Sequence, residues 1–140
     1  MSKKFATLDE QLCFALYSAS SKLTSIYRPI LKSLGLTYTQ FIVMMALWEK
    51  DQISITELAR KTGLSKATMT PLLRNLEAKS LITTNRVDSN ERQKLITVSE
   101  SGWQLAPESV KATEAAFCST GLTTDEAQKI IAMCRKINSI

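Results

Sequence analysis

The most informative pattern of apolar and polar residues lies between Ile53 and Ile82. In its second half, apolar residues recur at spacings of three and four, which predicts a helix with one buried face: Leu64, Met69, Leu72, Leu73 and Leu76. A shorter helix precedes it, and Gly63 suits the end of that helix because glycine adopts the left-handed conformation without steric cost. Ser65 is a typical N-cap, since its hydroxyl accepts an unpaired backbone N–H. The segment is therefore predicted to form two helices joined by a tight turn.

The next residues have the two-residue period of strands. Leu81–Arg86 is expected to form one strand, Val87–Arg92 a polar tip, and Lys94–Val98 a returning strand. Two helices joined by a turn and followed by a basic-tipped hairpin indicate a winged helix. The alternative is an ordinary helical hairpin inside a globular core, and the strands weigh against it.

Charge gathers on this predicted unit. The chain has a formal net charge of +5, and an excess of the same size lies between Arg60 and Lys94, with eight basic residues against three acidic ones. Short hydroxyl side chains let a helix approach a DNA groove, and a helix N-terminus attracts phosphate. We therefore predict a double-stranded DNA partner, bound through Ser65, Lys66, Thr68, Thr70, Arg74, Arg86, Arg92 and Lys94.

A long helix is expected before this unit, from Leu8 to Arg28. Thr7–Glu10 has the sequence of a capping box that opens it, and Pro29 ends the helix or kinks its end. Beside its apolar stripe runs a second line of uncharged residues, about 100° around the helix: Cys13, Tyr17, Ser20, Thr24 and Tyr27. One neighbour seldom covers so wide a face, so we expect part of it to contact a second subunit.

Three more helices complete the predicted architecture. Thr37–Gln40 has the sequence of another capping box, and two helices follow Gly102, one over residues 105–118 and one from Thr124. The fold class is mainly α (α+β): a winged helix-turn-helix with N- and C-terminal helical arms. The 140 residues suit one domain. Residues 5–50 and 104–140 are expected to form a dimerisation region, and residues 53–98 the DNA-binding lobe.

Composition excludes several other classes. No apolar run approaches the roughly 18 residues of a membrane span, and no signal-peptide core is recognised at the N-terminus. Three cysteines without such a signal suggest reduced thiols in the cytoplasm. The chain has no histidine, which rules out a histidine-based triad, and its cysteines are too scattered for a Cys-only metal site. We expect no membrane partner, no metal and no cofactor.

Cys13 is the candidate for thiol chemistry. A thiol attacks a peroxide as its thiolate, so a sensor cysteine needs groups that stabilise negative charge. As the sixth residue of a helix from Leu8, Cys13 gains only modest help from the helix dipole. Tyr17 lies one turn further on the same face, and a hydroxyl donor stabilises a thiolate. Taken alone, a single cysteine on an apolar helix is more often a small buried filler.

Two segments resemble the MarR family of bacterial repressors: LARKTGLSKATMTPLLRNLEAKSLI and the end of the wing, ERQKLITVSESG. The resemblance covers nearly the whole chain. Many members have D-x-R-D-x-R in the wing, where this chain has VDSNER. Arg92 matches the last arginine, which we place in a minor groove. The missing arginine and aspartate bear on ion pairing inside the wing.

The N-terminal helix resembles that of the organic-hydroperoxide-sensing OhrR branch, through LCFALYSA, Tyr27 and then GLTYTQF. In that branch the cysteine of this helix, here Cys13, is the peroxide sensor. Two tyrosines of the partner subunit hydrogen-bond it, and Tyr27 and Tyr38 match their spacing. Cys118 falls where two-cysteine members carry a resolving thiol. Cys134 is assigned to apolar packing.

The resemblance implies a homodimeric repressor of a palindromic operator. An organic hydroperoxide would oxidise Cys13, Cys118 of the partner subunit would capture the sulfenate, and the operator would be released. One alternative is a MarR-type repressor induced by a phenolic or other small ligand, with Cys13 incidental. A protein-binding module is another. An enzyme such as a thiol peroxidase is not expected, because no general base or arginine lies near Cys13 in sequence.

Overall fold

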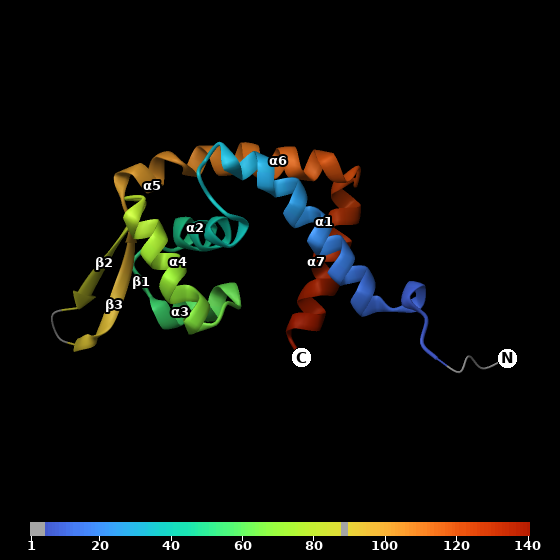
Figure 1. Ribbon diagram of the computed structural model, residues 1–140, viewed down its shortest axis with the longest axis horizontal. Helices are drawn as coiled ribbons and strands as arrows, with labels where there is room; N and C mark the ends of the chain where they lie inside the picture. The colour runs from blue at the N-terminus through green and yellow to red at the C-terminus, as the bar shows by residue number, and fades with distance from the viewer. Residues whose placement is uncertain (1–4, 88–89) are drawn as a thin grey trace.

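The structure, a computed structural model, describes residues 5–87 and 90–140, with the side chains of residues 87–93 outside that description (Figure 1). Its elements, in chain order, are η1 (Leu8–Glu10), α1 (Leu12–Lys32), α2 (Tyr38–Glu49), β1 (Ile53–Ser54), α3 (Ile55–Thr62), α4 (Lys66–Ala78), β2 (Ile82–Val87), β3 (Asn90–Val98), α5 (Glu100–Gln104), α6 (Ala106–Thr120) and α7 (Thr124–Asn138). The mainly helical winged-helix class is confirmed.

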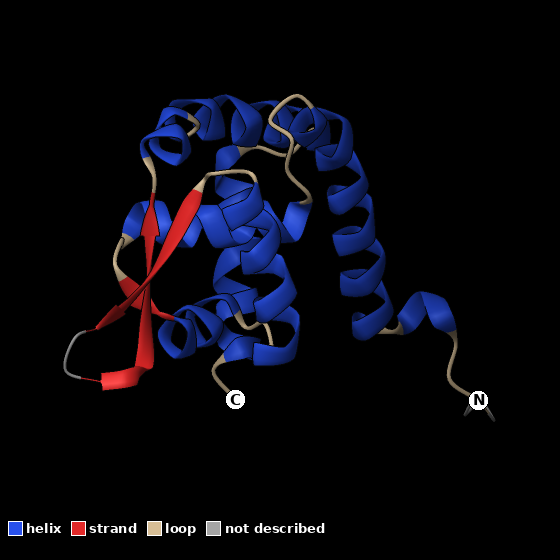
Figure 2. Cartoon of the chain, turned by 60° about the vertical axis from the view of Figure 1, so that its left-hand side comes forward, coloured by secondary structure: helices blue, strands red, loops and turns tan. Residues whose placement is uncertain are grey.

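The helices and strands form two groups in space. The small sheet lies with α3 and α4 on one side, and α1, α6 and α7 lie on the other (Figure 1). Helix α2 lies between them and packs on α1, α3, α4 and α6. Figure 2 shows the β2–β3 hairpin standing at the edge of the molecule, away from the arms.

The sheet is antiparallel, with strand order β1–β3–β2. Ile53 of β1 pairs with Ile96, and on the other side of β3 Arg86 pairs with Lys94. The sequence pattern did not predict β1, because two residues are too few to show alternation. The polar tip is also shorter than predicted, since β3 already begins at Asn90.

The core forms where α2, α3, α4 and the sheet meet. Its largest fully buried side chains include Phe41, Met44, Leu58, Met69, Leu76 and Ile96. Trp48 packs edge-on against Phe41, with ring centroids 6.4 Å apart. Its indole N–H donates to the carbonyl of Gly102 at 3.1 Å, which links α2 to α5.

Several predicted helix ends are confirmed. Gly63 ends α3 with a φ of 75°, and Gly121 ends α6 with a φ of 71°. Thr37 and Gln40 form the predicted capping box of α2. The C-terminal helix begins at Thr124, as predicted. In each case the end of the helix depends on contacts between residues that are close in sequence, and such contacts can be predicted from the sequence.

The N-terminal helix was predicted wrongly at its start, and it ends at Lys32, beyond the predicted Arg28. Of the two alternatives for Pro29, a place just after the helix is wrong. Thr7 makes no capping bond to the backbone, because its hydroxyl donates to the Glu10 carboxylate at 2.7 Å instead. A short 3-10 turn forms there, and α1 begins only at Leu12. At the other end α1 continues through Pro29 to Lys32, although Pro29 has no N–H for the Ser25 carbonyl.

Gly102 was predicted to separate the last strand from the helices that follow it. It lies instead inside the short helix α5. A Cβ atom there would overlap the Leu81 carbonyl oxygen and the Val98 side chain. The glycine is therefore explained by close packing of α5 on the sheet rather than by a turn.

Candidate DNA interface and sensor cysteine

The turn between α3 and α4 exposes the start of α4. Ser65 caps α4 by accepting the Thr68 N–H at 3.1 Å, and its own hydroxyl donates to the Thr68 hydroxyl at 2.9 Å. Both residues and Lys66 are exposed. The remaining N–H groups of the first turn have no partner within the helix. This end of α4 can therefore accept a phosphate or approach base edges.

Burial divides α4 into two faces. Met69, Leu72, Leu73 and Leu76 are buried, as the sequence pattern predicted, whereas Thr70 and Arg74 are exposed. The Thr70 hydroxyl donates to the Lys66 carbonyl at 3.1 Å, so its oxygen remains available as an acceptor. The exposed face thus offers hydroxyl, ammonium and guanidinium groups, which suit hydrogen bonds to DNA.

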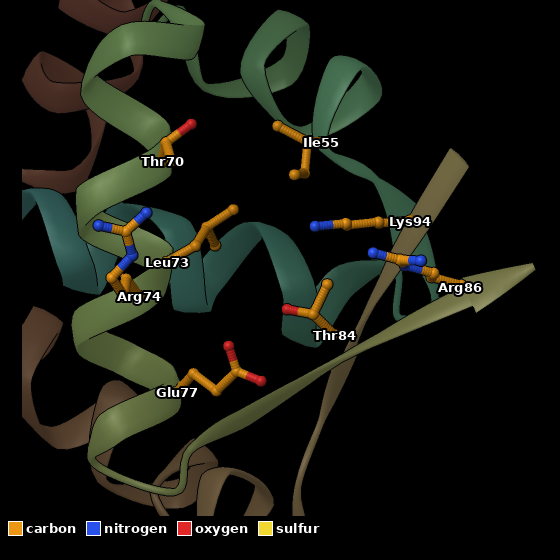
Figure 3. Close-up of a pocket in the computed structure, with 8 residues that line it drawn as sticks. All are labelled: Ile55, Thr70, Leu73, Arg74, Glu77, Thr84, Arg86 and Lys94. Atoms are coloured by element: carbon orange, nitrogen blue, oxygen red, sulfur yellow. The ribbon is translucent and has the colours of Figure 1, made fainter. Parts of the chain in front are cut away.

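A groove of about 310 Å³ separates α4 from the hairpin (Figure 3). Its walls are Ile55 of α3, four residues of α4 and three of the hairpin strands: Thr70, Leu73, Arg74, Glu77, Thr84, Arg86 and Lys94. Figure 3 shows Arg86 and Lys94 pointing from the strands toward α4. The two are cross-strand partners, and neither forms an ion pair with any residue that the structure describes. Like charges that face each other across strands favour an anion between them.

The structure brings most of the predicted DNA contacts to this surface. Exposed side chains there include Ser65, Lys66, Thr68, Thr70, Arg74, Arg86 and Lys94. The side chain of Arg92 lies outside the described residues. Sequence reasoning missed Ile55, Leu73, Glu77 and Thr84 as groove residues. Thr84 could have been found, since it lies two residues from Arg86 and so shares its face of the strand.

Cys13 is exposed and is the second residue of α1. The prediction that it lies six residues into a helix is therefore corrected. Cys13 therefore lies in the first turn of α1, the part of a helix in which the dipole acts. Gln11, the N-cap residue, supplies no side-chain cap.

The two tyrosines that the resemblance assigns to the sensor lie together. The rings of Tyr27 and Tyr38 are 5.1 Å apart, and both side chains are half-buried. Burial, and secondarily Tyr38, raise the pKa of Tyr27 above its usual value of 10.0. The Tyr27 phenol is thus a protonated hydrogen-bond donor at neutral pH.

These tyrosines cannot reach Cys13 of their own chain. Tyr27 lies 14 residues after Cys13 in α1, and at 1.5 Å per residue this is about 21 Å along the helix axis. Only Cys13 of a second copy could meet them. Tyr17 is one turn from Cys13 on the same helix, and its side chain is 73% exposed.

The other two cysteines differ in their surroundings. All three thiols are free, and Cys118 is exposed near the end of α6. Cys134 is half-buried and lines a groove of about 320 Å³ between α1 and α7, beside Leu16, Tyr38, Ile130 and Ile137. Its surroundings are mainly apolar, in keeping with the packing role assigned to it.

Residues 5–87 and 90–140 contain neither a cluster of metal ligands nor a helix that could span a membrane. No group of three or more histidine, cysteine, aspartate or glutamate side chains there could hold a metal ion. No helix in the same residues has the length and hydropathy needed to span a membrane.

Comparison with known proteins identifies the family. The family model described as transcriptional regulator SarA/Rot matches residues 25–108, which is more than half of the chain. The chain belongs to the SarA/Rot family of transcriptional regulators. It is a MarR-type winged-helix regulator.

Three relatives are informative. The chain is 36% identical over 103 residues to the organic hydroperoxide resistance transcriptional regulator of Bacillus subtilis, covering 74% of this chain and 70% of the relative. It is similar to reduced AbfR bound to DNA, at 30% identity and a TM-score of 0.78, covering 94% of this chain and 92% of that one; AbfR of Staphylococcus epidermidis has also been solved with a disulfide formed. Bordetella bronchiseptica BpsR, whose DNA binding is regulated by 6-hydroxynicotinic acid, matches at 25% identity and a TM-score of 0.87, covering 97% of this chain and 99% of that one.

Proposed function

We propose that this regulator is a homodimeric repressor that senses organic hydroperoxides through Cys13 and then releases a palindromic operator. The observation that carries the proposal is the place of Cys13: a free, exposed thiol in the first turn of α1, which a peroxide can reach. The similarity to the Bacillus subtilis hydroperoxide regulator supports this choice of oxidant.

The chemistry proceeds in two steps. The Cys13 thiolate attacks one oxygen of the hydroperoxide, the O–O bond breaks, and the alcohol leaves after taking up a proton. Cys13 is then a sulfenic acid. In the second step the Cys118 thiolate of the partner subunit attacks the Cys13 sulfur, a disulfide forms, and the sulfenic oxygen leaves as water.

Two protomers are required by this proposal. Tyr27 and Tyr38 lie too far from Cys13 of their own chain to stabilise its thiolate, so the partner supplies them. The exposed apolar side chains have a matching distribution. Among the described residues, all of the large apolar side chains that are exposed to solvent lie within residues 5–23 or 103–140. These segments are the arms, and a second copy would cover them.

Release of DNA follows from a change in the spacing of the two α4 helices. In a dimer on a palindrome, recognition helices lie about 34–36 Å apart, one turn of DNA. A disulfide between α1 of one protomer and α6 of its partner would move the arms, and the winged helices would lose that spacing. Ser65, Lys66, Thr68, Thr70 and Arg74 of α4, with Arg86, Arg92 and Lys94 of the wing, are the proposed DNA contacts.

The decisive test is operator binding by the wild-type protein and by Cys13→Ser before and after cumene hydroperoxide. A duplex selected for binding to the reduced protein serves as the probe, and fluorescence anisotropy measures binding. We expect peroxide to release wild type but not Cys13→Ser, with the two equal before treatment. Cys134→Ser is the matched control and should behave as wild type.

Mass spectrometry and non-reducing gels test the resolving step. Wild type should give a dimer-sized covalent band that is absent in Cys118→Ser. Release of wild type with Cys13 unmodified, or release of Cys13→Ser by peroxide, would refute the redox proposal.

A second candidate function rests on a different cavity. Thr24, Arg28, Lys32 and Tyr38 line a hollow of about 660 Å³ between α1 and the turn before α2. Two cations beside an aromatic ring suit a small aromatic carboxylate, and the ligand that regulates BpsR belongs to this chemical class. In this case 6-hydroxynicotinic acid or salicylate would release Cys13→Ser from DNA without any oxidant.

A further inference from the structure

Lys79 connects the end of α4 to the turn between α1 and α2. It follows the last residue of α4, and its ammonium donates to the Gly35 carbonyl at 2.5 Å and to Oε1 of Gln40 at 2.9 Å. The contacts span 44 and 39 residues of sequence. Lys79 is exposed, but its ammonium is bonded to protein acceptors, which a pattern of charges along the chain does not show.

The acceptor in this contact is a rigid group. Gln40 is 5% exposed and is the only buried polar residue among the described residues. The same Oε1 also accepts the Thr37 N–H at 3.1 Å, while the Thr37 hydroxyl accepts the Gln40 N–H at 3.2 Å. Lys79 is therefore tied to the capping box that begins α2. Tyr38 lies between Thr37 and Gln40 in the sequence. The pair of Tyr27 and Tyr38 is therefore connected to the end of α4 through Thr37, Gln40 and Lys79.

The same end of α4 is also held to the C-terminal arm. Ser80, with a φ of 61°, presents its carbonyl to the Ser99 hydroxyl. Ser99 in turn caps α5 by accepting the Gly102 N–H at 3.0 Å. The C-terminus of α4 is thus bonded to the α1–α2 turn and, through Ser80 and Ser99, to the start of α5, which leads into the C-terminal arm. The first residues of α4 are exposed.

Helix α4 moves together with the core of its lobe, because Met69, Leu72, Leu73 and Leu76 are buried along its length. It has 13 residues, so its first residue lies about 20 Å from Lys79. If the lobe tilts by about 10° about Lys79, the start of α4 is displaced by about 3.5 Å, which is longer than a hydrogen bond. Small changes at Lys79 can therefore decide whether Ser65 meets its DNA contacts.

We propose that Lys79 is a positioning residue that sets the tilt of the recognition helix relative to the arms and transmits changes at the α1–α2 turn to DNA. Its distance from the N-terminus of α4 and its two protein acceptors separate this role from a direct phosphate contact. The part of the proposal that concerns peroxide rests on the proposed function, and the part that concerns DNA affinity does not.

Three variants of the full chain test the proposal. Lys79→Met keeps most of the stem but loses charge and donors, and Lys79→Arg keeps both. Lys136→Met removes the same charge at an exposed position of α7, and the Lys136 ammonium makes no hydrogen bond or ion pair with the described residues. Binding to the selected duplex is measured over a series of salt concentrations, before and after cumene hydroperoxide, together with urea unfolding.

We expect Lys79→Met to bind reduced operator about tenfold more weakly, the effect of losing one charge-assisted hydrogen bond. Its salt dependence should match wild type, because no phosphate contact is lost. The ratio of affinities before and after peroxide should also shrink, since the arms no longer hold α4 firmly. Lys79→Arg should restore both properties, and Lys136→Met should leave both unchanged.

Two outcomes overturn the proposal. A fall of about one in the salt slope of Lys79→Met would show a direct phosphate contact. A loss of stability in urea with unchanged DNA affinity would show a purely structural bond. If wild type itself does not respond to peroxide, the proposed sensing function fails, but the affinity and salt slope still test Lys79.

Discussion

At the residue scale, one glycine and one cysteine carry information that local patterns hide. Gly102 has no side chain because α5 packs directly on the Leu81 backbone. Cys13 owes its place in the first turn of α1 to Thr7, whose hydroxyl bonds to Glu10 rather than to the backbone. In both cases one short contact, which the sequence pattern does not show, explains the structural role of the residue.

Gly102→Ala should destabilise the fold by about 1–3 kcal/mol, because the new methyl group would overlap the Leu81 carbonyl and force α5 away from the sheet. Urea unfolding followed by circular dichroism measures the change. Ser101→Ala, an exposed substitution one residue earlier, should stay within about 0.5 kcal/mol of wild type. Equal stability of the two variants would contradict the packing argument.

At the element scale, helix caps set where the helices of the proposed DNA interface and of the arms begin. Ser65 caps α4 and Thr123 caps α7 with the same geometry, each accepting an N–H at 3.1 Å. Only the first cap belongs to the proposed DNA interface. The second lies in the C-terminal arm, where Thr123 and Glu126 form a capping box. A comparison of the two caps therefore distinguishes an effect on helix stability, which both should show, from an effect on DNA binding, which only Ser65 should show.

Ser65→Ala should lose about 1 kcal/mol of stability and also bind operator more weakly, since the start of α4 frays and a hydroxyl near the phosphates is lost. Thr123→Ala is the matched control, with a similar loss of stability and unchanged DNA affinity. Urea unfolding and fluorescence anisotropy give the two quantities. Unchanged DNA binding by Ser65→Ala would remove Ser65 from the interface.

At the scale of the whole molecule, the middle of the chain and its two ends form regions with different surfaces. The lobe with α3, α4 and the hairpin has a packed core and a basic groove. The arms leave large apolar side chains open, with Ile131 and Met133 of α7 exposed at 49% and 63%. A second copy is the expected cover, and it would also bring Tyr27 and Tyr38 to Cys13.

Analytical ultracentrifugation should give about twice the chain mass of 15.6 kDa. Ile131→Lys should shift the protein toward monomer and weaken operator binding, because a charge would be buried in the interface. Gln128→Lys adds the same charge at an exposed polar position of α7 and should remain dimeric. A monomeric wild-type protein that still binds the palindrome tightly would rule out the dimer.

By itself the sequence determined the helix-turn-helix, the hairpin and most helix ends. Those features depend on short-range chemistry: the apolar period of α4, the hydroxyl of Ser65, the left-handed Gly63 and the capping box of Thr37 and Gln40. The exposed residues of α4 followed from the same period. The assignment of Cys13 as the peroxide sensor came from the family resemblance.

Only the tertiary structure decided how those parts are joined. It showed that β1 exists and that α1 begins at Leu12. It also showed that Lys79 bonds the end of α4 to the α1–α2 turn and to Gln40. It also brought Tyr27 to Tyr38 and separated both from Cys13 of the same chain. The physical reason is that these relations depend on contacts between residues far apart in sequence, whereas a periodic pattern reports only which face of one element is buried.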